Sequence, residues 1–541
     1  MAMTFTPDQQ KVIDIRDCNV LVSAAAGSGK TAVLVERILG LISDSEHPVD
    51  IDRLLVVTFT NAAAAEMRER IHNAILARLE SEPDNDNLQR QAVLVHHAQI
   101  TTIDSFCRFI LKNHFQEIDL DPGFTIGDPG KIKLMEKEAV AKVMEEAYAG
   151  AQWYEGFYND FIDMTDVYAT KGQDRAVEDM VMRLYRFVMS LPFPEKWLMH
   201  TLEDYQFKTM EEFLNSSYIR SIVTLVSNKL ERMIVQYNAL LQVASEAGGP
   251  DKYVPLLERE REMVLEAVNG ADYAQLKDAV CSITFDRLPT IRKDEACDED
   301  KKEAVKQGRE RIKKRVAALK ENYFFESLSD MKEDMLIAGK VLKPLVYLTL
   351  ALMKQFAADK AKENVIDFSD MEHFALKILV DEDGNPTDTA RLYQEHYAQV
   401  MIDEYQDSNE VQELLLTVVS KDGWDKPNRF MVGDVKQSIY KFRMARPELF
   451  LEKYHRYQLA GGRETRIDLK QNFRSRKEVI DAVNNVFYPL MDEAVGGIRY
   501  DEDAALYVGA TYPEALQRED GQSTAQTEML IYEYKDENGE A

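Results

Sequence analysis

Residues 19–39, NVLVSAAAGSGKTAVLVERIL, decide the fold of this chain. An apolar run typical of a buried strand leads into the glycine-rich turn AAAGSGKT, residues 24–31, and then into an amphipathic helical pattern. The turn has the spacing of the phosphate loop G-x-x-x-x-G-K-[ST], with Ala24 at the first glycine position. Strand, turn and helix in this order predict a phosphate group held at the helix N-terminus.

Each position of the loop has a chemical reason. Gly27 and Gly29 allow backbone N–H groups to surround an anion, Lys30 reaches the β- and γ-phosphates, and Thr31 offers a hydroxyl to Mg²⁺. A glycine-rich turn without nucleotide is the alternative, and the flanking strand and helix argue against it. The predicted ATP-binding stretch is Ala24, Ala25, Ala26, Gly27, Ser28, Gly29, Lys30 and Thr31.

Composition bounds the class of protein. With 541 residues and 45% hydrophobic content, we expect two to four domains. The 66 basic and 94 acidic residues give a net charge of -28, which argues against a nucleic-acid partner unless positive charge is local. Four scattered cysteines predict no disulfide or zinc site, and the absence of a long apolar run predicts a soluble, cytoplasmic protein without membrane contact.

The pattern of elements changes along the chain. Strands and helices alternate over the first ~120 residues, and a Pro- and Gly-rich break follows at residues 119–131. Residues 131–364 have helical spacing, within which the charged stretch 294–320 is either a solvated helix or a DNA-facing basic strip. The α/β pattern returns at VIDFSDMEHFALKIL, residues 365–379, with Asp367 or Ser369 as the expected N-cap.

A second strand end carries acidic residues. In VMIDEYQDS, residues 400–408, Asp403 is placed to hold Mg²⁺ and Glu404 to orient or deprotonate a water. Alone, such a pair is usually an N-cap and a surface charge. Together with the phosphate loop it predicts hydrolysis of the nucleotide.

Two further segments complete the candidate site. VGDVKQSIYKFR, residues 432–443, offers Gln437 as a γ-phosphate sensor, with Tyr440 and Phe442 as either exposed stacking faces or core residues. In LKQNFRS, residues 469–475, Arg474 is a candidate arginine finger or an ordinary salt-bridge residue.

These segments, with TPDQQ (6–10), VTFTNAAAAEM (57–67) and ITTIDSF (100–106), resemble in order the motifs of superfamily 1 DNA helicases of the UvrD type. The resemblance implies that Gln9 and Phe473 contact adenine and that Arg443 and Arg474 approach the γ-phosphate. It also implies a set of single-stranded DNA contacts: Phe59, Thr60, Asn61, Thr102, Asp104, Tyr440 and Phe442.

Details indicate one branch of that family. Asp104 stands where simple UvrD and PcrA helicases usually have histidine, and residues 365–379 and 433–450 are similar to the RecB and AddA helicase-nucleases, most of all to AddA (RexA) of Gram-positive bacteria. The implied fold is α/β: a RecA-like P-loop NTPase domain with a parallel sheet, interrupted by a large all-helical insertion. Its expected parts are domain 1A (1–125 and 365–465), the helical domain 1B (126–364) and the start of domain 2A (466–541).

The resemblance implies a 3′ to 5′ motor that uses ATP and Mg²⁺ on single-stranded DNA and duplex DNA ends in recombinational repair, together with an AddB-like (RexB-like) partner chain.

Motif V of these helicases is not recognisable in the sequence. LYVGATYPEA, residues 506–515, has Tyr512 at the finger-arginine position, and YEYKD, residues 532–536, lacks the upstream nuclease aspartate. We therefore expect the N-terminal portion of a longer polypeptide, with the nuclease domain outside this chain.

Two alternatives stay open at this point. One is part of a UvrD- or PcrA-type repair helicase, which a nuclease motif further along the parent chain would exclude. The other is an ATP-binding switch or scaffold that does not process DNA, which stimulation of ATP hydrolysis by single-stranded DNA would exclude.

Overall fold

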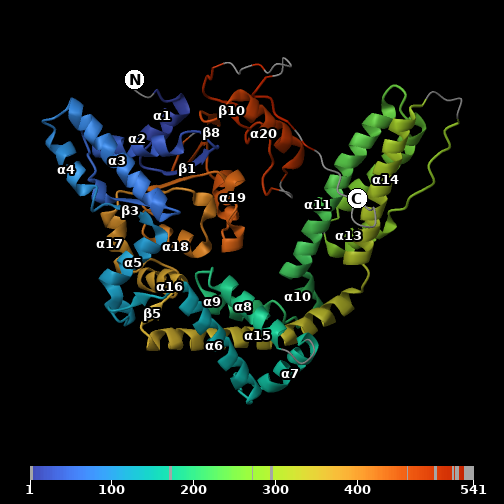
Figure 1. Cartoon of the computed structure of the whole chain (residues 1–541). Coiled ribbons are helices and arrows are strands. Elements are labelled where there is room, and N and C mark those ends of the chain that lie inside the picture. The colour runs from blue at the N-terminus through green and yellow to red at the C-terminus, as the bar shows by residue number, and fades with distance from the viewer. Residues whose placement is uncertain are drawn as a thin grey trace. The chain divides into compact units, whose positions relative to one another are not determined.

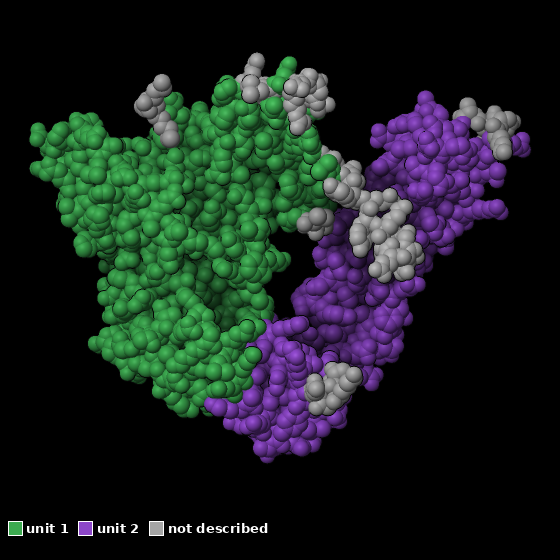
Figure 2. Space-filling model, in the orientation of Figure 1, with its two compact units in different colours: residues 1–139, 184–194, 354–541 green, residues 140–183, 195–353 purple. Residues whose placement is uncertain are grey.

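The chain forms two compact units in the computed structural model. Unit 1 comprises residues 1–139, 184–194 and 354–541, and unit 2 comprises residues 140–183 and 195–353 (Figure 2). The structure describes residues 4–169, 174–270, 272–292, 297–459, 461–492, 496–513, 517, 523–528 and 530. The YEYKD segment lies outside these residues, as do the last two residues of LYVGATYPEA. The predicted boundaries of domains 1A, 1B and 2A stay a prediction.

Unit 1 is built on a parallel sheet of six strands in the order β3-β2-β6-β7-β1-β8 (Figure 1). All five strand pairs are parallel, so the carboxyl ends of the strands share one edge of the sheet. The predicted strands before the phosphate loop and before Asp403 are confirmed. The strand bounds are β1 Asn19–Ala24, β2 Leu54–Thr58, β3 Gln99–Thr102, β6 Gln399–Ile402, β7 Arg429–Gly433 and β8 Glu464–Leu469.

Helices connect and cover these strands. In chain order they are α1 Pro7–Asp14, α2 Lys30–Ile42, α3 Asn61–Ser81, α4 Asp86–Leu94, α5 Ile103–His114, α16 Phe368–Leu379, α17 Asp388–His396, α18 Glu410–Val418, α19 Pro447–Arg456 and α20 Lys477–Leu490. The helix α16 begins after Asp367, whose side chain accepts a hydrogen bond from the Asp370 N–H, so one of the two predicted N-caps is confirmed.

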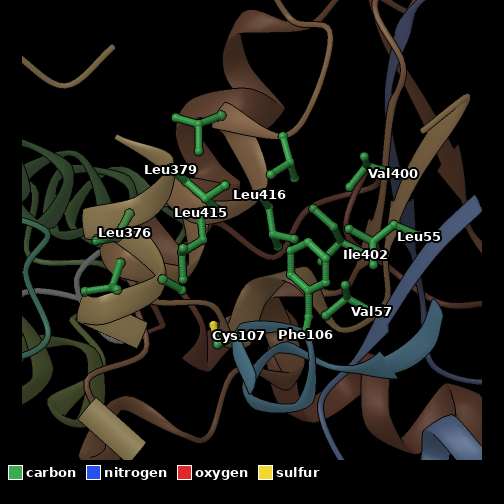
Figure 3. Close-up of a cluster of buried hydrophobic side chains, with 14 of the residues drawn as sticks. Leu55, Val57, Phe106, Cys107, Leu376, Leu379, Val400, Ile402, Leu415 and Leu416 are labelled. Atoms are coloured by element: carbon green, nitrogen blue, oxygen red, sulfur yellow. The ribbon is translucent and has the colours of Figure 1, made fainter. Parts of the chain in front are cut away.

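Alternation along the buried strands divides the core into two layers. Leu55 and Val57 of β2 pack on one face, with Phe106 of α5 and the apolar faces of α16 and α18 (Figure 3). Leu54 and Val56 of the same strand pack on the opposite face, against α2 and α3. A strand whose residues are buried on both faces is typical of a parallel sheet covered by helices on both sides.

The long excursion between the two α/β segments is closed by a short parallel pair. The strand β4, Thr125–Ile126, pairs with β5, Val365–Ile366. The chain therefore leaves and re-enters the α/β part of unit 1 at the same place. Two more short strands, β9 Gln471–Asn472 and β10 Tyr507–Val508, also pair in parallel.

Unit 2 is helical throughout its described residues. Four helices form its main core, α11 Ser217–Ser245, α12 Val254–Val268, α13 Tyr273–Ser282 and α14 Glu299–Tyr323. The described part of the charged stretch 294–320 belongs to α14, which buries Val305, Ile312 and Val316. The α14 region is thus a solvated helix with one buried face, and a DNA-facing role stays a prediction. The other helices wholly in unit 2 are α7 Phe157–Tyr168 and α10 Met210–Leu214.

Four helices cross the boundaries between the units: α6 Pro129–Tyr148, α8 Arg175–Val188, α9 Pro194–Glu203 and α15 Leu328–Lys362. Within the described residues, α15 is the one helix long and apolar enough to cross a membrane by length and composition, with 28% of its apolar window buried. Buried Val346, Leu348 and Leu352 show that it also contributes to packing. A single helix of this kind is weak evidence for a membrane span, because core helices meet the same criterion.

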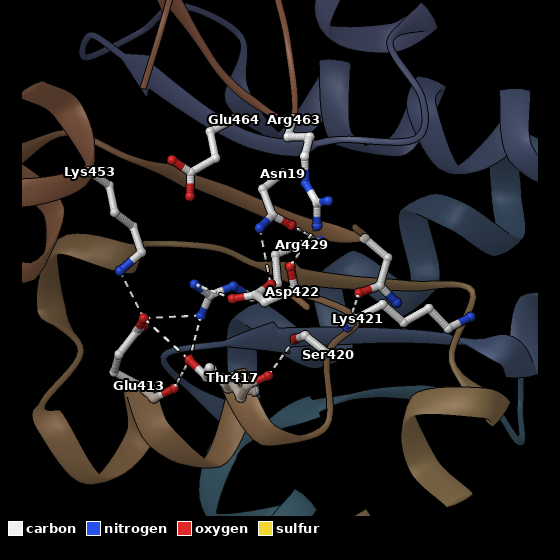
Figure 4. A network of polar contacts seen from close by, with 12 residues as sticks. Asn19, Glu413, Thr417, Ser420, Lys421, Asp422, Arg429, Lys453, Arg463 and Glu464 are labelled. Atoms are coloured by element: carbon white, nitrogen blue, oxygen red, sulfur yellow. Dashed lines mark hydrogen bonds and ion pairs between the residues drawn. The ribbon is translucent and has the colours of Figure 1, made fainter. Parts of the chain in front are cut away.

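A buried ion network fixes β7 against α18 and α19 in unit 1 (Figure 4). The Arg429 side chain, 3% exposed, donates to Glu413 at 3.0 Å and to Asp422 at 2.9 Å. Glu413 also accepts from Lys453 at 2.8 Å and from the Tyr405 hydroxyl at 2.9 Å. Burial alone would raise the pKa of Glu413, but the two cations and these hydrogen bonds lower it to about 2.

Candidate functional site

The phosphate loop follows β1 and leads into α2, as predicted. Gly27 and Gly29 have φ angles of 70° and 84°, a backbone region that favours glycine. A Cβ at Gly27 would lie 2.8 Å from the Arg474 Cβ, so the site also needs a small residue there. Gly29 caps α2 without a side-chain hydrogen bond, which leaves the first N–H groups of the helix available to an anion.

The other loop residues line the same turn. Ala24 ends β1, Ala25 donates its N–H to the Leu469 carbonyl at 2.9 Å, and Ala26 accepts from the Asn472 amide at 2.8 Å. Ser28 is 1% exposed, and its Oγ has no hydrogen-bond partner among the described residues. A buried hydroxyl without a partner, beside a free helix N-terminus, fits a loop shaped for a phosphate group.

The two predicted catalytic strand ends meet at Lys30. Its Nζ lies 3.2 Å from both carboxylate oxygens of Glu404, which follows β6. Thr31, the next residue of α2, is half-buried. The pairing brings together residues 374 positions apart in the sequence, because β1 and β6, which have β7 between them in the sheet, end at the same sheet edge.

Asp403 and Glu404 differ in environment. Burial and the Glu404 charge raise the pKa of Asp403 to about 6, and the Lys30 charge offsets only part of that rise. The Asp403 carboxylate accepts a hydrogen bond from the Glu404 N–H at 3.0 Å. Glu404 has a φ of 52°, in the left-handed region that non-glycine residues seldom occupy. The strained turn directs the two adjacent carboxylates to different partners.

Gln437 lies at the end of β7 and donates to the Asp434 carboxylate at 2.8 Å. The Asp434 N–H in turn donates to the side chain of Gln406 at 3.0 Å. Gln406 also donates to Glu404 at 2.7 Å. Gln406 was not among the predicted site residues, although it stands two positions after Glu404 in the sequence.

The predicted adenine contacts border one cavity of about 280 Å³. Gln9 and Phe473 both line it, together with Thr6, Ser28 and Lys470. Gln9 is fixed by a capping box with Thr6 and donates from Nε2 to the Ser28 carbonyl at 2.9 Å. The structure therefore brings the N-terminal glutamine, the phosphate loop and Phe473 together.

Asn472 is a second residue that sequence analysis missed. Besides its bond to the loop carbonyl of Ala26, its Oδ1 accepts from the N–H groups of Arg474 at 2.9 Å and Ser475 at 2.7 Å. The Phe473 N–H donates to the Gly27 carbonyl at 2.8 Å. This segment is thus fastened to the phosphate loop, with Arg474 next to Gly27. In the sequence, Asn472 stands directly before the two predicted site residues Phe473 and Arg474.

The predicted DNA-stacking residues form an aromatic patch of Phe59, Tyr440 and Phe442. The rings of Phe59 and Tyr440 lie 4.7 Å apart, those of Tyr440 and Phe442 lie 5.8 Å apart, and Phe442 is 76% exposed. The Arg443 guanidinium lies 5.4 Å from the Tyr440 ring. Arg443, predicted to approach the γ-phosphate, therefore lies within this patch.

The polar DNA candidates lie at two helix N-termini. Thr60 caps α3, with Asn61 as its first residue, and Thr102 caps α5 through the Ser105 N–H. The Asn61 oxygen lies 3.5 Å from the Thr102 hydroxyl. Asp104 in the first turn of α5 has its pKa raised by burial. Caps explain the threonines structurally, and a DNA contact stays a prediction for all four residues.

One cavity of about 210 Å³ connects the two groups of candidates. Asp403, Glu404 and Asp407 line it from the nucleotide side, and Phe59, Thr102, Asp104 and Arg443 line it from the side of the aromatic patch. No cluster of three or more His, Cys, Asp or Glu residues suited to a metal occurs within the part of the chain that the structure describes. Thr31 and Asp403 as metal contacts stay a prediction.

A parallel sheet whose first strand enters a glycine-rich loop and a helix, with an acidic pair at the end of another strand on the same edge, defines a P-loop NTPase fold. A profile of the UvrD/REP helicase N-terminal domain matches residues 5–458. The chain belongs to the UvrD/REP helicase family, and this family implies the use of ATP.

Curated relatives share a single description, the A-type subunit of an ATP-dependent helicase/nuclease. The protein from Lachnoclostridium phytofermentans is 44% identical over 551 residues, 99% of this chain and 39% of the relative. Those from Clostridium botulinum and Thermoanaerobacter are each 40% identical, over 94% and 95% of this chain and 41% of each relative. The chain spans about two fifths of these proteins, and the predicted resemblance to helicase-nucleases is confirmed.

Proposed function

We propose that this chain is the ATP-hydrolysing part of a DNA helicase motor. The cavity lined by both Glu404 and Phe59 carries the proposal, because Glu404 is the residue proposed to activate the water and Phe59 belongs to the aromatic patch proposed to stack on DNA. The relatives' description as ATP-dependent helicase/nucleases supports the same activity.

Each residue has a defined part in the proposed reaction. Lys30 and the N–H groups of the phosphate loop bind the β- and γ-phosphates, and Gln9 and Phe473 hold the adenine. Thr31 and Asp403 hold Mg²⁺, which neutralises negative charge on the phosphates when bound. Glu404 orients and deprotonates the attacking water, and Arg474 approaches the γ-phosphate.

Lys30 has a second consequence for Glu404. In the described structure the two side chains form an ion pair at 3.2 Å. A phosphate group bound to Lys30 competes with that pair and frees the Glu404 carboxylate to accept a proton. The Glu404 carboxylate thereby becomes available for the water when nucleotide binds.

The DNA partner is held by stacking on the aromatic patch and by the polar residues Thr60, Asn61, Thr102 and Asp104. Stacking is independent of base sequence, which suits a motor that moves along a strand. The parent protein's 3′ to 5′ movement, nuclease activity, double-strand-break repair, cytoplasmic location and AddB-like partner belong to the same proposal. The word "subunit" in the relatives' description supports a partner chain.

The test is ATP hydrolysis with and without single-stranded DNA. We expect stimulation by DNA, loss of turnover in Glu404→Gln with ATP binding retained, and loss of stimulation in Phe442→Ala. ATP binding without any response to DNA would replace the motor with an ATP-binding switch. A UvrD- or PcrA-type parent is the remaining alternative, and a nuclease motif in the parent chain would exclude it.

A further inference from the structure

Gln406 lies between the ends of two neighbouring strands of the sheet. It belongs to the 3-10 helix Tyr405–Asp407 that follows Glu404, and it is 1% exposed. Its Nε2 donates to the Glu404 carboxylate at 2.7 Å and, more weakly, to Asp407 at 3.3 Å. Its Oε1 accepts from the Asp434 N–H at 3.0 Å. Both ends of the carboxamide are therefore used, one on each strand end.

The chain leaves space for this carboxamide at Gly433, the last residue of β7. A Cβ at Gly433 would overlap the Gln406 Oε1 and lie 3.1 Å from the Phe450 ring. The Gly433 φ is not in the left-handed region, so backbone strain does not account for glycine here. Close approach of Gln406 does account for it.

The other described partner of the Glu404 carboxylate is Lys30. Under the proposed function, Lys30 turns to the phosphates, and Gln406 is then the described side chain that still holds Glu404. Glu404 sits on a strained backbone at φ 52°, so its side chain needs a fixed partner to keep one direction.

We propose that Gln406 is a positioning residue that holds the Glu404 carboxylate in its reactive orientation and aligns it with the Asp434 backbone. Asp434 begins the segment that carries Gln437 and Tyr440, and its carboxylate accepts from the Gln437 amide at 2.8 Å. If this segment shifts on DNA binding, the shift is passed to the Glu404 carboxylate through the Gln406 carboxamide. This inference rests on the proposed role of Glu404.

The test compares four variants of the protein: Gln406→Leu, Gly433→Ala, Glu404→Gln and the control Gly423→Ala, whose added Cβ meets no atom within 4 Å. The measurements are kcat and KM for ATP with single-stranded DNA, and the Kd of a fluorescent ATP analogue. We expect Gln406→Leu to lower kcat about 10- to 100-fold with Kd within about twofold, since misplacement of a catalytic group by ~1 Å has effects of this size.

Gly433→Ala changes neither Gln406 nor Glu404 and is expected to lower kcat in the same way by displacing the carboxamide. If Gln406→Leu fails to fold, the Gly433→Ala variant still tests the positioning role. Unchanged kcat in Gly433→Ala and in any folded Gln406→Leu, with Glu404→Gln inactive, would overturn the positioning role and leave the proposed function intact. If ATP binding falls together with kcat in Gln406→Leu and Gly433→Ala, the positioning role is also overturned, because a joint loss indicates that Gln406 is needed for the structure of the site. Full turnover in Glu404→Gln would instead remove the proposed role of Glu404 and, with it, this inference, whereas ATP hydrolysis that does not respond to DNA would overturn the proposed motor function.

Discussion

The Glu413→Gln substitution tests the buried ion network most directly. Glu413 is the shared acceptor of Arg429 and Lys453, whose side chains are 3% and 6% exposed. Glutamine has nearly the same shape, so the change removes charge without a cavity. Asp422 still pairs with Arg429, but Lys453 is left without a carboxylate partner among the described residues.

The pKa of Glu413 gives the expected magnitude. The pKa is about 2 in the folded chain, against 4.5 ordinarily. At 1.36 kcal/mol for each pH unit, this lowering corresponds to about 3 kcal/mol of stability. Breaking a buried ion pair costs about 3–5 kcal/mol, which agrees. We therefore expect Glu413→Gln to lower the free energy of unfolding by about 3 kcal/mol.

Urea unfolding followed by circular dichroism at pH 7 measures this loss. The matched control is Glu410→Gln on the same helix, because the Glu410–Arg446 pair is partly exposed to solvent, far more than the Glu413 pairs, and its loss is expected to cost no more than about 1 kcal/mol. Because the folded pKa is depressed, the Glu413 contribution is complete above pH ~4.5 and disappears as the pH falls through ~2. Equal stability of the two variants at pH 7 would refute the reasoning.

Three further substitutions test the nucleotide and DNA residues. Lys30→Ala is expected to weaken ATP binding at least tenfold, measured by titration with a fluorescent ATP analogue, because it removes the charge at the phosphate loop. Gly27→Ala is expected to do the same, since its Cβ would lie 2.8 Å from the Arg474 Cβ at a φ of 70°, whereas Gly423→Ala is expected to have no effect. Phe442→Ala is expected to weaken single-stranded DNA binding by about 1–3 kcal/mol in fluorescence anisotropy and to leave the urea midpoint unchanged, because the ring is 76% exposed.

Features that depend on local pattern could be predicted from the sequence. The apolar strand before the phosphate loop, the two glycines with positive φ and the Asp367 cap are encoded by residues close together in the chain. The apolar run before Asp403 and Glu404 placed the two residues at a strand end. Because parallel strands end at a common edge, that position also brings them near the phosphate loop.

Features that depend on partners far apart in the chain could not be predicted. Asn472 reaches Ala26 across 446 positions, and the network of Arg429 joins residues from β7, α18 and α19. The strained φ of Glu404 and the space that Gly433 leaves for Gln406 follow from strand order, which no local pattern specifies. Arg443 illustrates the same limit: its contact with the Phe59 ring, 6.0 Å away, joins two distant segments and is not encoded by its sequence neighbours.

The net charge of -28 leads to a last prediction about DNA binding. The cations within four positions of Tyr440 or Phe442 are Lys436, Lys441, Arg443 and Arg446. Lys436 is paired with Asp434 at 2.9 Å and Arg446 with Glu410, whereas Lys441 lies 3.9 Å from Glu448. One or two phosphate contacts therefore remain, and each contributes about -0.7 to the slope of log K against log salt for a single strand. We expect a slope between about -0.7 and -1.4 for a short oligonucleotide.

Anisotropy titrations at several salt concentrations measure that slope. Phe442→Ala removes stacking and is expected to shift the line to lower affinity without changing its slope, whereas Arg443→Gln is expected to reduce the slope by about 0.7. A wild-type slope steeper than about -4 would contradict a stacking-based grip. It would show that backbone charges elsewhere in the chain hold the strand, since the patch does not contain enough cations to release that many counterions.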